Sequence, residues 1–220
     1  ACARLRDAAA ASSRSDRGVR PARRTGADPG IVSAPLDDRT DADLVALHCS
    51  GGQAAFAALM RRHKQPLYRL IVAQTGDAED AFDLLQETFM AAHAALARFD
   101  VDRSLRAWLA RIAINKCRDW HRRRRVRRAL AWVLPNENRD QVADPAASVE
   151  TQAVDRDALT HTLAAIARLP AALREPLLLC TIDALSQAEA AEALGVSVKT
   201  IETRVRRARR ALSAMLENND

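Results

Sequence analysis

A cluster of acidic and amide side chains recurs at helical spacing near the middle of the chain. Asp80, Asp83 and Glu87 are three or four residues apart, so a helix would place them on one face, beside Gln86. Paired carboxylates can act as general acids and bases. No histidine, nucleophile or glycine-rich loop accompanies them, so we do not expect an enzyme. The remaining interpretations are a solvated helix face and an acidic docking surface for a basic protein.

A second cluster combines aromatic, amide and cationic side chains. Trp108, Arg111, Asn115 and Arg118 follow one another at helical spacing, and a run of arginines begins at Arg122. Arginines bind phosphates, whereas aromatic rings and asparagine can contact bases, including unstacked ones. Trp108 also falls on an apolar stripe, which favours a core position. The arginine run alone could bind any polyanion or an acidic lipid surface.

A third motif, near the end of the chain, predicts two short helices joined by a tight turn. Ser186 and Glu189 form a capping box, Gly195 is suited to the left-handed end of that helix, and Ser197 can cap the next. The second helix is two-faced. Its expected core face is Val198, Ile201, Val205, Ala208 and Leu212. Its expected polar face is Lys199, Thr200, Thr203, Arg204, Arg206, Arg207 and Arg210.

A basic, hydroxyl-bearing helix that follows a glycine turn is typical of the recognition helix of a helix-turn-helix in a DNA major groove. The alternative is a solvated basic face on an ordinary helical hairpin. The formal net charge of +6 over 220 residues suits a polyanionic partner. No apolar run is long enough to span a bilayer. The four cysteines show no CxxC pairing and no histidine at ligand spacing, so we expect no metal site and no cofactor.

These clusters must be positioned by helices, because only 4% of residues are aromatic and alanine, leucine and arginine dominate. The spacing predicts a helix from Asp41 to Gly51, then one broken or restarted near Pro66. A third helix is predicted from about Ala78 to Arg98, with an apolar stripe of Phe82, Leu85, Phe89, Ala92 and Leu96. A fourth, capped by Ser104, is predicted to end at Pro135, with a stripe of Leu105, Trp108, Leu109, Ile112 and Lys116.

The later part of the chain predicts a second helical domain. An apolar helix is expected over 173–182, where Pro176 is tolerable only in the first turn. The predicted fold is therefore all-α, with two small helical domains joined by a flexible linker. The expected boundaries are a disordered tail over 1–36, a first domain over 37–134, a linker over 135–153 and a helix-turn-helix domain over 154–220.

Together these segments resemble a sigma factor of the bacterial sigma-70 family, in particular its small extracytoplasmic-function (ECF) group. The resemblance covers about residues 41–216. Several motifs in the same order across two domains make it specific. They are A-E-D-A-F-D-L-L-Q-E-T-F at 78–89, F-D at 99–100, R-A-W-L-A-R-I-A-I-N-K-C-R-D at 106–119, L-P-A-A-L-R-E-P-L-L-L at 169–179 and the final helix-turn-helix.

The resemblance implies that the chain binds core RNA polymerase (beta and beta-prime subunits) and promoter DNA in the bacterial cytoplasm, without membrane insertion, and that an anti-sigma factor regulates it. Core polymerase would be contacted by Asp80, Asp83, Gln86 and Glu87. The -10 element would be melted and read by Phe99, Arg103, Trp108, Arg111, Asn115, Arg118 and Arg122. The -35 element would be read by Ser197, Lys199, Thr200, Thr203, Arg204 and Arg207.

Two rival functions stay open at the level of sequence. A polymerase-independent repressor or activator would use the last helix but leave the acidic cluster and the middle helix without a role. An interaction adaptor would use the helical domains for protein binding alone. Co-purification separates the three, because a sigma factor needs core polymerase, a repressor or activator needs only DNA, and an adaptor needs neither.

Overall fold

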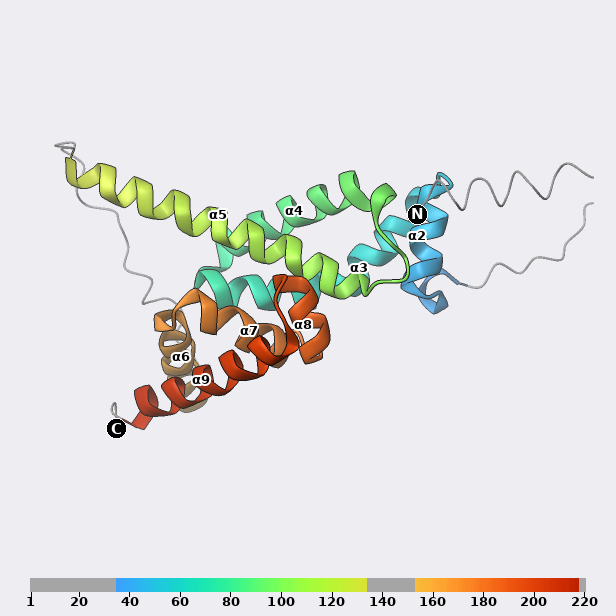
Figure 1. The fold of residues 1–220 in the computed structure, drawn as a ribbon. Coiled ribbons are helices and arrows are strands. Elements are labelled where there is room, and N and C mark those ends of the chain that lie inside the picture. The colour runs from blue at the N-terminus through green and yellow to red at the C-terminus, as the bar shows by residue number, and fades with distance from the viewer. Residues whose placement is uncertain (1–34, 134–152, 218–220) are drawn as a thin grey trace, which may run out of the picture. The chain divides into compact units, whose positions relative to one another are not determined.

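The computed structural model describes residues 35–133 and 153–217, and within these ranges every regular element is a helix. This confirms the predicted all-α class. The α-helices of the described residues are labelled in Figure 1. They are α2 (Asp41–Cys49), α3 (Gln53–Thr75), α4 (Ala78–Ala95), α5 (Leu105–Val133), α6 (Ala153–Arg168), α7 (Ala171–Thr181), α8 (Gln187–Leu194) and α9 (Val198–Glu217). Two short 3-10 helices, η1 (Leu36–Asp38) and η2 (Leu96–Arg98), complete the set.

The predicted tail and linker lie almost wholly outside the described residues, and the predicted domain boundaries stay predictions. By its internal contacts the chain divides into two units. One contains the residues up to Arg62 together with His93–Leu105, and the other contains His63–Ala92 together with the residues from Arg106 onward.

The first unit is organised around α2, whose start is fixed by a capping box. The Thr40 hydroxyl accepts a hydrogen bond from the Asp43 backbone N–H at 3.2 Å, and the Asp43 carboxylate accepts one from the Thr40 N–H. Leu44 and Val45 of α2 are fully buried, and α2 contacts η2. The ring of His93 lies edge-on to Phe56, with the ring centres 4.8 Å apart. The contact with η2 holds α2 against the residues that follow α4, and the ring pair links α3 to the end of α4.

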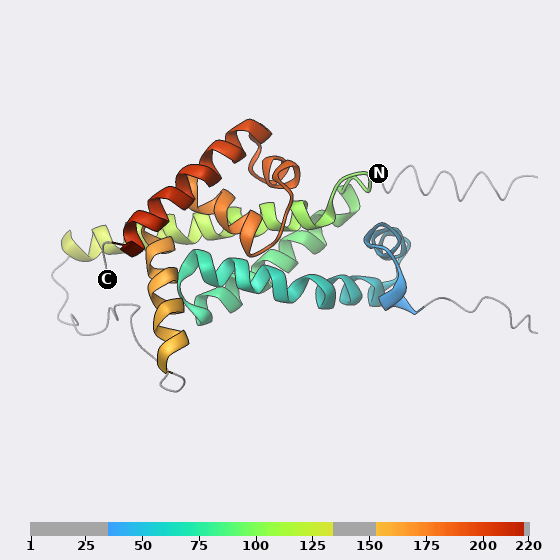
Figure 2. The ribbon, with the colours of Figure 1, turned by 90° about the horizontal axis from the view of Figure 1, so that it is seen from below.

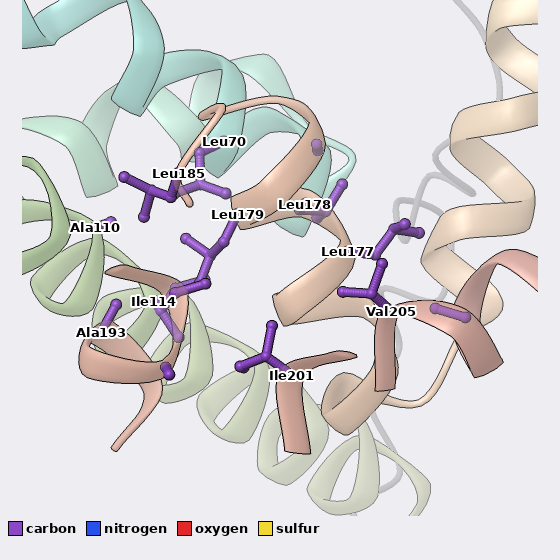
Figure 3. Packing of buried hydrophobic residues seen from close by; sticks show 14 of the residues in the cluster. Leu70, Ala110, Ile114, Leu177, Leu178, Leu179, Leu185, Ala193, Ile201 and Val205 are labelled. Carbon is purple, nitrogen blue, oxygen red and sulfur yellow. The ribbon is translucent and has the colours of Figure 1, made fainter. Parts of the chain in front are cut away.

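The second unit has a core in which α7 is central. Leu178 and Leu179 of α7 are fully buried with Ile201 of α9, and Figure 3 shows them in one cluster with Leu70 of α3 and Ile114 of α5. The contacts between α6, α7, α8 and α9 can be followed in Figure 2. Truncating such a buried side chain to alanine costs about 2–5 kcal/mol, so this cluster is a main source of stability.

Two prolines differ from their predicted roles. Pro66 lies inside α3, which runs unbroken from Gln53 to Thr75, so the predicted interruption there is wrong. Pro176 is the sixth residue of α7 and not part of its first turn. Each proline removes one backbone hydrogen bond, at a cost of about 3 kcal/mol in a helix interior. Burial of the leucines that follow each proline offsets this cost, which a local pattern does not reveal.

Three predicted apolar stripes also need correction. Phe82 of α4 is 48% exposed, and the buried face of that helix is formed instead by Ala81, Leu84, Leu85, Thr88, Phe89 and Ala92. Ile112 of α5 is only half-buried, whereas Ile114, Cys117 and Trp120 are buried. Val198 at the start of α9 is 42% exposed. Helices α4 and α5 are thus rotated slightly from the predicted orientation, because alanines that carry little pattern signal occupy the closest packing positions. Helix α9 has the predicted orientation, and Val198 is exposed as its first residue.

Candidate functional site

The turn between α8 and α9 has the predicted geometry. The Ser186 hydroxyl accepts from the Glu189 N–H at 3.2 Å, while Glu189 Oε2 accepts from the Ser186 N–H at 2.9 Å. Gly195 has a left-handed backbone (φ 67°), and the Val196 N–H donates to the Ala191 carbonyl at 3.0 Å, as in a Schellman cap. The predicted capping box and glycine turn are confirmed.

Helix α9 begins directly after this turn and separates an apolar from a polar face. The Ser197 hydroxyl accepts from the Thr200 N–H at 3.2 Å and caps the helix. Ile201, Val205 and Ala208 are buried, which fixes the rotation of the helix. The residues expected to read the -35 element share the first half of α9: Ser197, Lys199 and Arg207 are exposed, and Thr200, Thr203 and Arg204 are half-exposed.

The acidic cluster lies on α4, whose start is capped by Asp77. Oδ1 of Asp77 accepts from the backbone N–H groups of Glu79 and Asp80, at 2.9 and 3.0 Å. Further along the helix, Asp83 and Gln86 are exposed, whereas Asp80 and Glu87 are half-buried.

A groove of about 590 Å³ lies between α4 and α5, lined by Asp80, Asp83 and Glu87 from α4 and by Trp120, Arg123 and Val126 from α5. Glu87 is already engaged, because it accepts from Lys116 Nζ at 3.1 Å. The structure therefore brings three of the four predicted docking residues to the edge of one groove.

The residues expected to read the -10 element are divided between the two units. Trp108, Arg111, Asn115, Arg118 and Arg122 lie on α5, where Trp108 is half-buried and the other four are exposed. Asn115 Oδ1 accepts from Arg118 at 3.3 Å, and Arg122 pairs with Asp119 at 3.0 Å.

The other two predicted -10 residues belong to the first unit. Arg103 is exposed and precedes α5. Phe99 is only 4% exposed, so its ring belongs to the core of that unit in this arrangement. A base could stack on the Phe99 ring only after a local rearrangement.

Sequence reasoning missed a set of buried charges contributed by α7 and the residues after it. Both oxygens of Glu175 accept from Arg118, at 2.8 and 2.5 Å. Asp183 is fully buried and accepts from Arg106 at 3.3 Å, and burial raises the pKa of its carboxyl. No motif signals these pairs, because the partners are 57 and 77 residues apart in sequence.

The buried Arg174 completes this set. Its guanidinium donates to Gln74 Oε1 at 3.1 Å and to the Ala167 carbonyl at 3.0 Å, and it lies 3.2 Å from His121 Nε2. Burial, followed by the charge of Arg174, lowers the pKa of His121. A neutral imidazole with its proton on Nδ1 can accept from Arg174 through Nε2, and in that tautomer Nε2 does not also donate to the Gln74 carbonyl, which lies 3.0 Å away. The charge of Arg174 favours the uncharged histidine.

The described residues contain no group of three or more histidine, cysteine and acidic side chains placed to hold a metal ion. None of the described helices is long and apolar enough to cross a membrane.

Two sequence models of known families match the helices that carry these clusters. Sigma-70 region 2 matches residues 59–127, and Sigma-70 region 4 matches residues 162–212. The chain is also 42% identical over 182 residues to the RNA polymerase sigma factor CnrH of Cupriavidus metallidurans, which covers 80% of this chain and 95% of the relative. The chain belongs to the sigma-70 family. Further relatives place it in the ECF group.

Among these relatives, the ECF sigma factor SigM of Mycobacterium tuberculosis is 36% identical over 190 residues, which is 86% of this chain and 90% of SigM. Solved structures agree with this assignment. CnrH in complex with the cytosolic domain of CnrY matches with a TM-score of 0.61 and 36% identity, over 82% of this ECF sigma factor and 99% of CnrH. RpoE of Bartonella quintana, in complex with the anti-sigma factor NepR, matches with a TM-score of 0.58 and 26% identity, over 74% and 96% of the two chains.

Proposed function

We propose that this ECF sigma factor binds core RNA polymerase and directs initiation at promoters that carry a -35 and a -10 element, and that it is not itself an enzyme. The observation that carries the proposal is the start of α9. Ser197 caps a helix whose buried face is fixed by Ile201 and Val205, so the polar side chains between them are held outward on a rigid element.

The -35 element would be read by this polar face of α9. Arg204 and Thr203 have the chemistry to contact base edges in the major groove, whereas Lys199 and Arg207 suit phosphates. The capped turn before α9 supports this role, because it fixes where the helix begins and so where its first polar side chains lie. The contact set is Ser197, Lys199, Thr200, Thr203, Arg204 and Arg207.

Core polymerase, through its beta and beta-prime subunits, would dock on the acidic face of α4. Asp83 and Gln86 are exposed and stand on a helix that is anchored by its buried opposite face, so they present a rigid acidic surface. Asp80 and Glu87 lie at the groove beside this face. Their half-burial suits a supporting role at the rim of the interface.

Opening of the -10 element would depend on α5 and the residues before it. Arg111, Asn115 and Arg122 are exposed on a long helix that is rich in arginine, a combination suited to single-stranded DNA. The full proposed set is Phe99, Arg103, Trp108, Arg111, Asn115, Arg118 and Arg122. A base flipped out of the duplex would be held by stacking and by hydrogen bonds to its edge.

An anti-sigma factor would regulate the protein in the bacterial cytoplasm. Support comes from two similar structures, one of CnrH with the cytosolic domain of CnrY and one of RpoE with the anti-sigma factor NepR. The whole proposal is tested by transcription in vitro with purified core polymerase and a genomic template, followed by sequencing of the RNA starts. We expect new starts preceded by one shared pair of elements. Site-specific binding to DNA without polymerase, and no new starts, would instead indicate a repressor or activator.

A further inference from the structure

A cavity of about 290 Å³ lies where α3, α5 and the start of α7 meet in the second unit. Three arginines line it, Arg118, Arg125 and Arg174, against one carboxylate, Glu175. Both oxygens of that carboxylate are taken up by Arg118. The Cys117 thiol also lines the cavity, and burial raises its pKa to about 12, so it adds no negative charge. The cavity is therefore cationic.

Arg174 is the buried member of these three arginines, and its charge is compensated only by the nearby Glu175 carboxylate, to which it makes no hydrogen bond. Its side chain is buried, and within the described part of the chain its guanidinium hydrogen-bonds only to the neutral groups of Gln74, Ala167 and His121. Burying a cation without an anionic hydrogen-bond partner is costly. An anion in the cavity would reduce that cost.

Two further donors converge on the same cavity. Gln74 is 3% exposed, and its Nε2 is buried with no hydrogen-bond partner among the described residues. Arg174 donates to Oε1 and so sets the orientation of this amide. The amino group is then left without an acceptor. Helix α7 starts at the cavity with Ala171, and its N-cap Pro170 provides no side-chain hydrogen bond. The first N–H groups of an uncapped helix favour an anion.

We propose that this cavity is a binding site for a small phosphate-bearing anion, held by Arg125 and Arg174 at the start of α7. Arginine is suited to phosphate oxygens, because its planar fork donates two parallel hydrogen bonds. Arg125 is exposed and has no partner among the described residues, so it can close over a bound anion without breaking another contact. A bound anion would also link α5 to α7 and stabilise their packing.

Calorimetry on the full chain tests the site, with pyrophosphate and inorganic phosphate as the probes. We expect saturable binding with one site per chain. Arg125→Gln should weaken it by about tenfold or more, which is the usual worth of one hydrogen bond to a charged group. Arg128→Gln is the matched control, because Arg128 is an exposed arginine of the same helix that does not line the cavity. It should bind both probes as the parent does.

A second variant tests the deeper part of the site. Gln74→Glu would supply the carboxylate that Arg174 lacks, so we expect a higher melting temperature and loss of pyrophosphate binding. Circular dichroism would confirm an unchanged helix content. Equal losses in the Arg125 and Arg128 variants, or no saturable binding to either probe, would overturn the proposal. A phosphate of the DNA backbone would be the ligand instead if only duplex binding, and not pyrophosphate binding, fell in Arg125→Gln.

Discussion

The guanidinium of Arg118 on α5 donates to both carboxylate oxygens of Glu175 on α7, at 2.8 and 2.5 Å. The two side chains differ greatly in exposure, 50% for Arg118 and 7% for Glu175. Losing the arginine would therefore leave a buried carboxylate unpaired, whereas losing the carboxylate would leave a guanidinium that water can reach. This difference predicts that replacing Arg118 should lower the free energy of unfolding more than replacing Glu175 does.

Arg118→Gln should lower the free energy of unfolding by about 2–3 kcal/mol, and Glu175→Gln by about 1 kcal/mol. Urea denaturation monitored by circular dichroism measures both values. Arg122→Gln is the control, because Arg122 and Asp119 form an exposed pair on the same helix that should contribute less than about 0.5 kcal/mol. Equal losses in the Arg118 and Glu175 variants would contradict the assignment of the buried partner.

The same pair bears on DNA binding. Arg118 donates to Glu175 through Nε and Nη2 and to Asn115 through Nη1, so a DNA phosphate would have to compete with these acceptors for the guanidinium. Glu175→Gln should therefore bind a single-stranded -10 oligonucleotide more tightly, by about threefold to tenfold if one charged hydrogen bond is released. Fluorescence anisotropy gives the comparison. If Glu175→Gln also binds more tightly in an Arg118→Gln background, the gain has another source.

The acidic face of α4 offers a direct test of polymerase docking. Replacing Asp83 and Gln86 together with alanine removes two exposed polar groups and leaves the buried face intact, so the fold should be unchanged. We expect this variant to lose competition for core polymerase against a second sigma factor. Asp38→Ala, which removes an exposed carboxylate outside α4, is the control. Undiminished competition by the double variant would remove α4 from the interface.

Arg204 on α9 separates base reading from phosphate contact. If Arg204 reads a base, Arg204→Ala should cost about 1–3 kcal/mol at the promoter and relax specificity at one position. If it contacts only phosphate, the loss should be similar on all sequences and the salt dependence should flatten. Arg209→Ala is the control. Arg209 is exposed, and it lies about 140° around the helix from Arg204, because the two are five residues apart. A promoter-binding curve that matches the parent would exclude Arg204 from the DNA contact.

The sequence was sufficient to predict those features that residues close together in the chain form by themselves. The capping box at Ser186, the left-handed Gly195 and the cap at Ser197 follow from residues within a few positions of one another. The rotation of α4 and the continuity of α3 through Pro66 did not follow, because they depend on burial against distant helices. The cationic cavity could not be predicted either, because its side chains come from three helices that are distant in the sequence.

The free energy of unfolding should depend on pH because of His121. Its ring lies against Arg174, with Arg124 and Arg125 close by on α5. Burial and then these positive charges lower the pKa of His121, despite the opposing contact of Nε2 with the Gln74 carbonyl at 3.0 Å. The unfolded chain therefore takes up this proton more readily than the folded chain. The stabilisation by neutral His121 is present above the usual histidine pKa of 6.5 and is lost as the pH falls through that value.

Urea denaturation between pH 8 and pH 5 measures this linkage. The free energy of unfolding should fall as the solution is acidified, and the proton uptake on unfolding derived from its slope should decrease in His121→Gln by as much as about one proton. Burial also lowers the pKa of His48, so part of the slope should persist in that variant. A pH dependence that is the same in the variant and the parent would show that His121 has the same proton affinity in both states, and that Arg174 does not depend on a neutral imidazole for its hydrogen bond.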